Sequence, residues 1–446
     1  MGIYYRDASV AAAKSLEEKP WQIVKDVKMC KEGTMIQPEK VGMSSERLAR
    51  IRPAIEKHIG HGKIAGAVTL LARRGELVHL DCFGLQNRDK NVPMQPATIF
   101  RIYSMTKPIT CVALMMLYEK GYFQLSDPVA KFIPAFQNLK VYAGDETSGM
   151  RLADLKRPVT LRDLLTHTSG LTYPFLEYGP VEALYRQDHA IVEKSLEEFV
   201  ASVVQWPLAF QPGTAWRYSV AHDFIAYLVE CMSGQPFDDY LRANVFEPLG
   251  MSDTGFYVPA DKLDRLAALY GSAHIEEIDM TGSKAWMAAA HGVHRLLAGP
   301  ADSRESAPHR VIRGGHGLVS TAPDYFRFCR MLVNKGELDG LRLLGRKTIE
   351  LMTVNHLAPE LMPYEIGGSY SPGYGYGLGF RVLHDVGQCG TLGSPGEYGW
   401  GGAATTYFWI DPQEELIGIV MAQFMPSGYH LIDSDFRVLA YQAIVD

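Results

Sequence analysis

The stretch SMTKPITCVALMMLYEKG, residues 104–121, decides the fold. Its apolar side chains stand on almost every side of the helix that the pattern predicts, with Pro108 in the first turn and Gly121 placed to end the helix. A helix that is apolar all round is buried. The preceding segment ATIFRIY, residues 97–103, is typical of a strand. The sequence therefore predicts a buried helix that begins directly after a strand.

Two polar residues open this apolar helix. Ser104 and Lys107 are three positions apart, so on a helix they share one face and their side chains can meet. A neutral lysine can accept the serine proton, and burial and the positive end of a helix both disfavour a charged ammonium. A bare Ser-x-x-Lys match is expected roughly once by chance in such a chain. The apolar surroundings make this one a candidate catalytic pair, because charges are seldom buried without a use.

The segments around the helix predict an α/β fold. Residues 65–86 contain two β-rich runs around the turn Arg73-Arg74-Gly75-Glu76, which indicates an antiparallel hairpin. Strand patterns return near the end of the chain, in residues 376–385, 404–412 and 416–424. Helical patterns occupy residues 44–60, 196–205, 222–234, 322–336 and 435–445. Strands at both ends with helices between them predict one antiparallel sheet assembled from both chain ends, with flanking helices and an inserted helical lobe.

This pattern divides the chain into three parts. Residues 1–40 form an N-terminal extension with weak patterning. Residues 41–120 and 315–446 form the α/β sheet domain, and residues 121–314 form a mostly helical domain.

Composition and charge exclude several classes of partner. A net charge of -6 and a pI near 6.2 give no basic field for nucleic acid. No segment approaches the roughly 20 apolar residues of a membrane-spanning helix, and the first residues are too weakly apolar for a signal peptide. The six cysteines are scattered, and Cys111 and Cys329 lie in helical apolar patterns, which favours reduced, buried thiols. We therefore expect a cytoplasmic protein without nucleic-acid or membrane partners.

We expect no metal and no cofactor. The pairs His58/His61 and His291/His294 have a spacing that suits metal ligands, but neither has an acidic third ligand nearby in a fixed motif. The glycine-rich string at 373–380 leads into a strand rather than a helix, unlike a dinucleotide fingerprint.

Four phrases stand in one order along the chain: Ser-x-x-Lys at 104–107, LYEKGYFQLSDPVAKFIPAF at 117–136, LLTHTSGLTY at 164–173 and GHGLVSTAPDYFRF at 315–328. In this order they resemble the serine β-lactamases and penicillin-binding proteins, and within them the esterases called family VIII carboxylesterases. The resemblance covers roughly residues 41–446. It implies the β-lactamase/transpeptidase-like fold, with Ser104 as nucleophile and Lys107 as one of the residues that handle its proton. The family uses the segment that corresponds to LLTHTSGLTY to support the site, so the resemblance implies a structural role for His167.

The second motif of that family is Tyr-x-Asn, and Tyr218-Ser219-Val220 occupies its place. The resemblance implies that the Tyr218 phenol hydrogen-bonds the nucleophile and passes its proton to the leaving group. A phenol next to a lysine has its ionised form favoured, which suits this role. The family's asparagine is replaced here by Val220.

The third motif of the family is Lys-Thr-Gly or a variant of it, and Trp400-Gly401-Gly402-Ala403 stands in its place, as in the esterase branch. The family's oxyanion hole uses the N–H of the nucleophile and one from this strand, which corresponds to the N–H of Ala403. Glycines at this point let a substrate approach the backbone.

Two departures from the lactamase pattern tilt the expected substrate toward neutral esters. Val220 and Trp400 replace polar and cationic residues that would bind a β-lactam, and they add apolar surface. Further aromatic residues near the motifs are candidates for an acyl or alcohol pocket, namely Tyr103, Tyr173, Phe175, Tyr178 and Tyr398.

The resemblance therefore implies a serine carboxylesterase that cleaves small or short-chain carboxylic esters through an acyl-enzyme. A second possibility keeps the same residues in a β-lactamase, a D-amino peptidase or an acyltransferase. A third is a ligand-binding member of the fold without catalysis. The Gly-x-Ser-x-Gly elbow of α/β-hydrolases is absent from the chain, so esterase activity must come from Ser104. The natural ester, the oligomeric state and the division of proton transfer between Lys107 and Tyr218 stay open.

Overall fold

The computed structural model describes residues 35–147, 149–176, 178–188, 193–272 and 294–446. Residues 1–34 of the expected extension lie outside this part of the chain, and so do Cys30 and His291.

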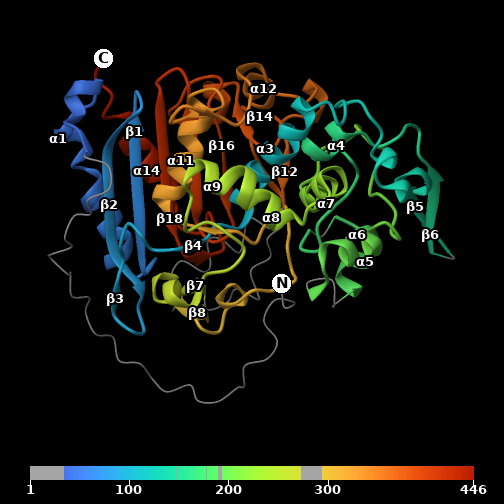
Figure 1. Cartoon of the computed structure of the whole chain (residues 1–446), viewed down its shortest axis with the longest axis horizontal. Helices are drawn as coiled ribbons and strands as arrows, with labels where there is room; N and C mark the ends of the chain where they lie inside the picture. The colour runs from blue at the N-terminus through green and yellow to red at the C-terminus, as the bar shows by residue number, and fades with distance from the viewer. Residues whose placement is uncertain (1–34, 148, 177, 189–192, 273–293) are drawn as a thin grey trace.

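The central element is an eight-stranded antiparallel sheet with strand order β14-β15-β16-β17-β18-β1-β2-β3. Strand β1 from the start of the chain pairs with β18 from its end, with Ala67 opposite Ala422. Figure 1 shows these blue and red strands side by side. The expected sheet built from both chain ends is confirmed. Its strands are β1 Gly66–Arg73, β2 Glu76–Asn87, β3 Val92–Pro93, β14 Tyr374–Tyr376, β15 Arg381–Leu383, β16 Tyr398–Gly402, β17 Thr406–Asp411 and β18 Leu416–Ala422.

The hairpin between β1 and β2 closes through the turn that the sequence predicts. Arg73 pairs with Glu76, and the two residues between them, Arg74 and Gly75, have φ of 53° and 80°. Positive φ at both central residues is the mark of a type I′ turn, whose twist matches that of the strands it joins.

Helices cover both faces of the sheet, which explains why every residue of β1 is buried. Alternate side chains of this strand enter two different cores: Val68 and Leu70 pack with the helices α3 and α11, whereas Ala67 and Leu71 pack with α2 and α14. The helices are α1 Ser45–Leu48, α2 Ile51–Gly60, α3 Thr106–Glu119, α4 Leu161–Leu165, α5 Pro180–Gln187, α6 Leu196–Val203, α7 Ala221–Ser233, α8 Phe237–Leu241, α9 Glu247–Leu249, α11 Ala322–Val333, α12 Arg346–Met352, α13 Val386–Cys389 and α14 Ile432–Tyr441.

The helix expected over 44–60 is divided into two. Ser44 caps α1 by accepting a hydrogen bond from the N–H of Arg47, and α2 begins at Ile51. Pro53 explains the interruption, because its ring clashes with the carbonyl of the residue four positions earlier, Ala49. A proline is tolerated in the first turn of a helix, and that is where α2 places it.

Helices dominate the middle of the chain, from α4 to α9, and the hairpin of β5 and β6 lies at the same end of the molecule as α4, α5 and α6 (Figure 1). After this region, β7 pairs with β8 and runs parallel to β19. The division into domains proposed from the sequence stays a prediction. The remaining strands are β4 Phe100–Arg101, β5 Lys140–Glu146, β6 Gly149–Asp154, β7 Leu269–Ser272, β8 His294–Ala298, β9 Val319–Ser320, β10 Glu337–Leu338, β11 Leu341–Arg342, β12 Glu365–Ile366, β13 Ser369–Tyr370 and β19 Phe424–Met425.

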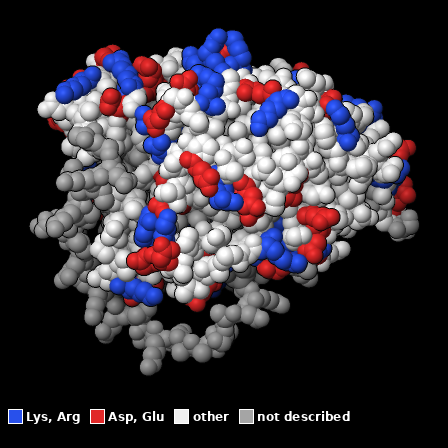
Figure 2. All heavy atoms as spheres, viewed as in Figure 1, with Lys and Arg blue, Asp and Glu red and all other residues white. Residues whose placement is uncertain are grey.

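On the face drawn in Figure 2, Lys and Arg side chains are interspersed with Asp and Glu side chains.

Cys111 and Cys329 are buried thiols, as their apolar patterns indicate. Within the described ranges, no helix is long and apolar enough to cross a membrane. The cytoplasmic location expected from the sequence stays a prediction.

Candidate active site

The site begins where strand β4 gives way to helix α3. A single 3₁₀ turn, Tyr103–Met105, carries Ser104, and Thr106 opens the helix. Tyr103 has a φ of 44°, a left-handed conformation that is rare for a bulky residue and that marks a locally strained backbone directly before the serine. As expected, every residue from Thr106 to Leu117 is buried, so the first turn of α3 lies inside the protein.

Lys107 is fully buried, with an exposed fraction of 0%. Its Nζ donates to Oγ of Ser104 at 3.1 Å and to the carbonyl oxygen of Gly315 at 2.7 Å. The same nitrogen lies 4.5 Å from the ring centroid of Tyr218, over the face of the ring. The serine and lysine that the sequence places on one helix face therefore meet.

Tyr218 reaches the same serine from the segment that precedes α7. Its hydroxyl donates to Oγ of Ser104 at 2.6 Å. The serine oxygen thus receives hydrogen bonds from two groups that can each carry or release a proton, the phenol and the Lys107 nitrogen. A serine with a base in hydrogen-bond reach is the arrangement that nucleophilic catalysis requires.

Aromatic rings surround the phenol of Tyr218. The ring centroids of Tyr173, His167 and Trp400 lie 5.1, 5.0 and 5.7 Å from it. His167 also makes a 3.0 Å hydrogen bond between its Nδ1 and Oγ of Ser219. These contacts fix the ring next to Ser104.

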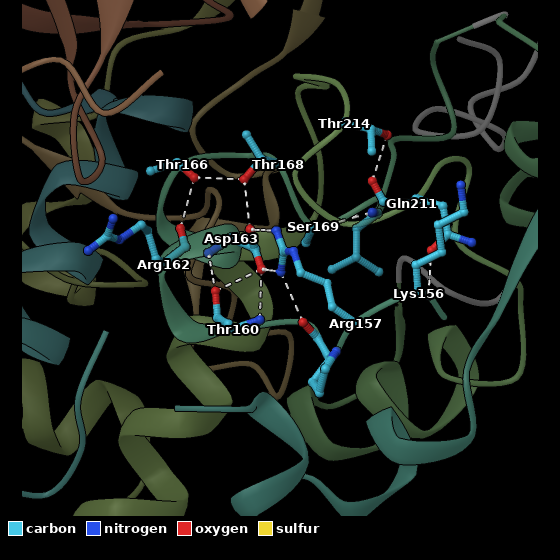
Figure 3. Close-up of polar contacts among 12 residues, drawn as sticks. Lys156, Arg157, Thr160, Arg162, Asp163, Thr166, Thr168, Ser169, Gln211 and Thr214 are labelled. Carbon is cyan, nitrogen blue, oxygen red and sulfur yellow. Dashed lines mark hydrogen bonds and ion pairs between the residues drawn. The ribbon is translucent and has the colours of Figure 1, made fainter. Parts of the chain in front are cut away.

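One carboxylate, that of Asp163, holds the turn between Thr166 and Thr168, the turn to which His167 belongs (Figure 3). Both oxygens of Asp163 accept from the Arg157 guanidinium, at 2.6 and 2.8 Å, and one of them accepts the N–H of Thr160 at 2.8 Å in a capping box that starts α4. The hydroxyl of Thr168 donates to the other at 3.2 Å.

Backbone bonds tie this turn to the segment of Tyr218. The N–H of Arg217 donates to the carbonyl of His167 at 2.9 Å, and the N–H of Gly213 donates to that of Thr168 at 2.8 Å. His167 itself has a φ of 59°, a conformation in which histidine is less disfavoured than most residues. The structural use of His167 that the sequence suggests fits this role as a support for Tyr218.

The Trp400-Gly401-Gly402-Ala403 segment forms the end of β16 and the turn after it, beside the 3₁₀ turn of Ser104. A Cβ on Gly402 would lie 2.3 Å from the carbonyl oxygen of Ile102, so only glycine permits this approach. Ala403 follows directly, and its carbonyl accepts the N–H of Ser427 at 2.8 Å. The segment that the family comparison assigns to the oxyanion hole therefore lies next to the serine.

The other candidate pocket residues are distributed around this centre. Tyr103 packs with the small apolar cluster that contains Ala404. Phe175 stacks on Tyr173 at 4.8 Å and lies 6.5 Å from Tyr218. Three other candidates take different positions. Val220 is buried in the main core at the start of α7, and Tyr398 is buried against Phe380. The hydroxyl of Tyr178 accepts the N–H of Gly367 at 2.8 Å.

Titratable groups around Lys107 are held in their neutral forms. Burial, and then the charge of Lys107, lower the pKa of His167 well below its usual range. Burial also lowers the pKa of His222, reinforced by His167 and Lys107, and it lowers that of His316 to about 3. These three imidazoles therefore favour their neutral forms, which add no positive charge to the surroundings of Lys107.

Sequence reasoning missed Asp223 and Gly315. Asp223 is 1% exposed, and its Oδ1 accepts the N–H of Gly315 at 2.8 Å. Gly315 is the first residue of the GHGLVSTAPDYFRF phrase, and the family resemblance of that phrase was the sequence signal for it. Among the described residues no group of three or more His, Cys, Asp or Glu side chains could hold a metal ion, and His58 is bonded to Asp435 at 2.8 Å.

Comparison with known proteins identifies a family and several relatives of this chain. The beta-lactamase family model matches residues 51–442. Protein Rv1367c of Mycobacterium tuberculosis strain ATCC 25618 / H37Rv is 34% identical, over 82% of this chain and 87% of its own length. Esterase EstB of Burkholderia gladioli is 32% identical, over 81% of this chain and 87% of EstB. The solved structure of EstCE1, described as a hydrolase with promiscuous acyltransferase activity, has a TM-score of 0.72 at 27% identity, over 89% of this chain and 99% of EstCE1.

Proposed function

The chain belongs to the beta-lactamase family, and on that premise we propose that it is a serine carboxylesterase that hydrolyses small or short-chain esters through an acyl-enzyme on Ser104. One observation carries the proposal: Lys107 Nζ and the Tyr218 hydroxyl converge on Oγ of Ser104, at 3.1 and 2.6 Å. The convergence supplies a nucleophile with two proton carriers at contact distance.

In the first half of the reaction, Oγ of Ser104 attacks the ester carbonyl carbon and its proton passes to Lys107 Nζ or to the Tyr218 oxygen, whichever is deprotonated. The carbonyl oxygen takes up the electron pair and faces the N–H groups of Ser104 and Ala403. The C–O bond to the alcohol then breaks, and the alcohol oxygen receives the proton that the serine gave up.

In the second half, a water molecule attacks the acyl carbon of the Ser104 ester. Its proton passes to the same pair of groups, the bond from carbon to Oγ breaks, and Oγ is protonated again. The carboxylic acid leaves, and Ser104, Lys107 and Tyr218 return to their starting state.

The apolar character of the surroundings favours an ester over a β-lactam. Trp400 stands where the lactamases carry a cationic residue, and Val220 stands where they carry asparagine. In this structure Trp400 lies against the ring of Tyr218, whereas Val220 is buried in the main core, so Trp400 carries this argument. The name of EstB, a relative that the chain matches over most of its length, supports the same substrate class.

The test is the rate of p-nitrophenyl butyrate hydrolysis by the wild type and by Ser104→Ala, which should lose about 10⁴-fold or more. Ser202→Ala is a matched control, because Oγ of Ser202 also accepts a hydrogen bond from a lysine, Lys194 Nζ at 2.7 Å. That variant should keep the wild-type rate. Equal rates in the wild type and Ser104→Ala would refute the proposal.

A fluorophosphonate probe separates catalysis from ligand binding. A competent nucleophile gives a covalent adduct on the peptide that contains Ser104, seen by mass spectrometry, whereas a binding protein without catalysis gives none. The adduct should be absent from Ser104→Ala.

Acyl transfer is the second candidate, favoured by the description of EstCE1. The same acyl-enzyme would then react with an alcohol or amine in place of water. Addition of a primary alcohol to the ester assay should raise the yield of the new ester at the expense of free acid if transfer competes. Nitrocefin hydrolysis tests the β-lactamase alternative in the same preparation.

A further inference from the structure

Asp223 is a buried carboxylate that the catalytic steps above do not use. It lies in the first turn of α7, shortly after Tyr218 in the chain, and its side chain is 1% exposed. Its Oδ1 accepts the N–H of Gly315 at 2.8 Å. Burying a carboxylate costs free energy unless it is paired or hydrogen-bonded, so the partner that accompanies Asp223 inside the protein indicates its role.

That partner is the residue that holds the catalytic lysine. The carbonyl oxygen of Gly315 accepts from Lys107 Nζ at 2.7 Å, which is shorter than the 3.1 Å between Nζ and Oγ of Ser104. One residue of backbone thus connects Asp223 to Lys107, with its N–H on the carboxylate and its C=O on the lysine.

Gly315 is confined at this point. A Cβ added to it would lie 2.8 Å from the hydroxyl of Tyr173 and 3.2 Å from Oδ1 of Asp223. The neighbouring Gly314 is as restricted, because a Cβ there would lie 2.0 Å from the carbonyl oxygen of His222. The loop therefore sits tightly against α7, and its orientation is set by what α7 presents to it.

The contact between Asp223 and Lys107 is indirect, through Gly315. Burial raises the pKa of Asp223, while Arg313, the N–H of Gly315 and Lys107 act in the opposite direction. The contact that carries the argument is therefore geometric: Oδ1 of Asp223 accepts the N–H of Gly315.

We propose that Asp223 is a positioning residue for Lys107: by holding the N–H of Gly315 it fixes the carbonyl oxygen that anchors Nζ beside Ser104. The inference rests on the proposed function, since it assigns a role in that reaction. A lysine has a long, flexible stem, so without this anchor Nζ has fewer constraints on its distance from Oγ of Ser104. A displacement of about 1 Å at a catalytic group can lower a rate about 10²-fold.

Two substitutions separate the acceptor from the charge. Asp223→Asn keeps an oxygen for the N–H of Gly315 and removes the charge, and kcat for p-nitrophenyl butyrate should stay within about threefold of wild type. Asp223→Ala removes the acceptor, and kcat should fall about 10²-fold. KM should change by less than about threefold in both, because the buried side chain does not reach the substrate.

Asp411 supplies a matched pair of controls. It is 0% exposed, and its Oδ1 accepts the N–H of Gln413 at 3.0 Å, at the opposite end of β17 from Thr406, the residue that pairs with Gly402. Asp411→Asn and Asp411→Ala should alter the thermal midpoint without a matching change in kcat per folded molecule. Circular dichroism gives the thermal midpoint and the folded fraction by which kcat is normalised.

The outcomes are distinct. The inference is overturned if Asp223→Ala keeps the wild-type kcat, if its loss equals that of Asp411→Ala, or if Asp223→Asn is as impaired as Asp223→Ala. Should Asp223→Ala fail to fold, Asp223→Asn and Gly315→Ala decide: the first must keep kcat, and the second, which leaves the charges intact, must lower it. If the wild type is no faster than Ser104→Ala, it is the proposed function that fails, whatever the Asp223 variants do.

Discussion

The hydroxyl of Tyr218 donates a hydrogen bond to Oγ of Ser104 at 2.6 Å. The two residues come from different parts of the fold, the 3₁₀ turn before α3 and the segment before α7. Their contact is therefore a product of tertiary packing. A nucleophile that already touches its proton carrier needs little rearrangement when the substrate arrives.

Removing only the hydroxyl tests that contact. Tyr218→Phe should lower kcat about 10²- to 10⁴-fold, because the ring stays among its aromatic neighbours while the proton carrier is lost. Steady-state kinetics with p-nitrophenyl butyrate measure the effect, and the thermal midpoint should change little. A rate within threefold of wild type would leave Lys107 as the sole proton carrier.

Lys107→Met should separate activity from stability. The variant should lose hydrolysis about 10³-fold or more, because a group that contacts Oγ of Ser104 is gone. Its free energy of unfolding should be equal to or about 1–2 kcal/mol above that of the wild type, because methionine has a similar length and needs no hydration. Urea unfolding at neutral pH gives the comparison. A marked loss of stability would mean that the bond to Gly315 also holds the fold together.

Phe175 is expected to influence acyl-length preference. It is half-buried, stacks on Tyr173 and lies near Tyr218, so Phe175→Ala should open space beside the reacting centre. We expect kcat/KM for p-nitrophenyl acetate to fall about threefold or more relative to the octanoate ester. The control is Tyr370→Ala, whose side chain is 65% exposed and which should leave the ratio unchanged. An unchanged ratio in Phe175→Ala removes this ring from the pocket.

The stability of the fold should fall in mild acid, in part through His79. Burial, with a smaller effect of Arg52, lowers the pKa of His79 from 6.5 to about 4. The unfolded chain therefore takes up a proton that the folded chain does not, so this contribution is complete above about pH 6.5 and is lost as the pH falls toward 4. His79→Gln retains a polar reach to Thr69, which His79 contacts at 2.7 Å. Near pH 5 the variant should take up about one proton fewer on unfolding, measured from urea midpoints across pH. An identical pH slope would contradict the assignment.

Local features of the sequence were sufficient for much of the fold. The two-residue turn at Arg74 and Gly75 and the all-round apolar pattern of α3 depend on neighbouring residues, so a linear reading finds them. The break before Ile51 was not predicted, because the periodic pattern over 44–60 outweighed the signal of Pro53. The order of the motifs pointed to the beta-lactamase family, which the family model confirms.

The site was less accessible to sequence reasoning. Ser104 and Lys107 could be paired because one helix turn relates them, whereas Tyr218 was reached only through resemblance. Asp223 and Gly315 were missed, because a carboxylate bonded to a distant backbone N–H leaves no periodic trace. Their roles, like those of Ser104, Lys107 and Tyr218, stay predictions until the variants are measured.

The pairing of β1 with β18 has a consequence for how the protein is made. During synthesis the apolar helix α3 leaves the ribosome long before β18 and α11, the elements that later cover the same core, exist. Until then, the apolar surface of α3 and the unpaired edge of β1 are exposed together, and such exposure makes a chain prone to aggregate. Yield in a heterologous host should therefore depend on translation speed, temperature and chaperone supply more than on the stability of the finished molecule.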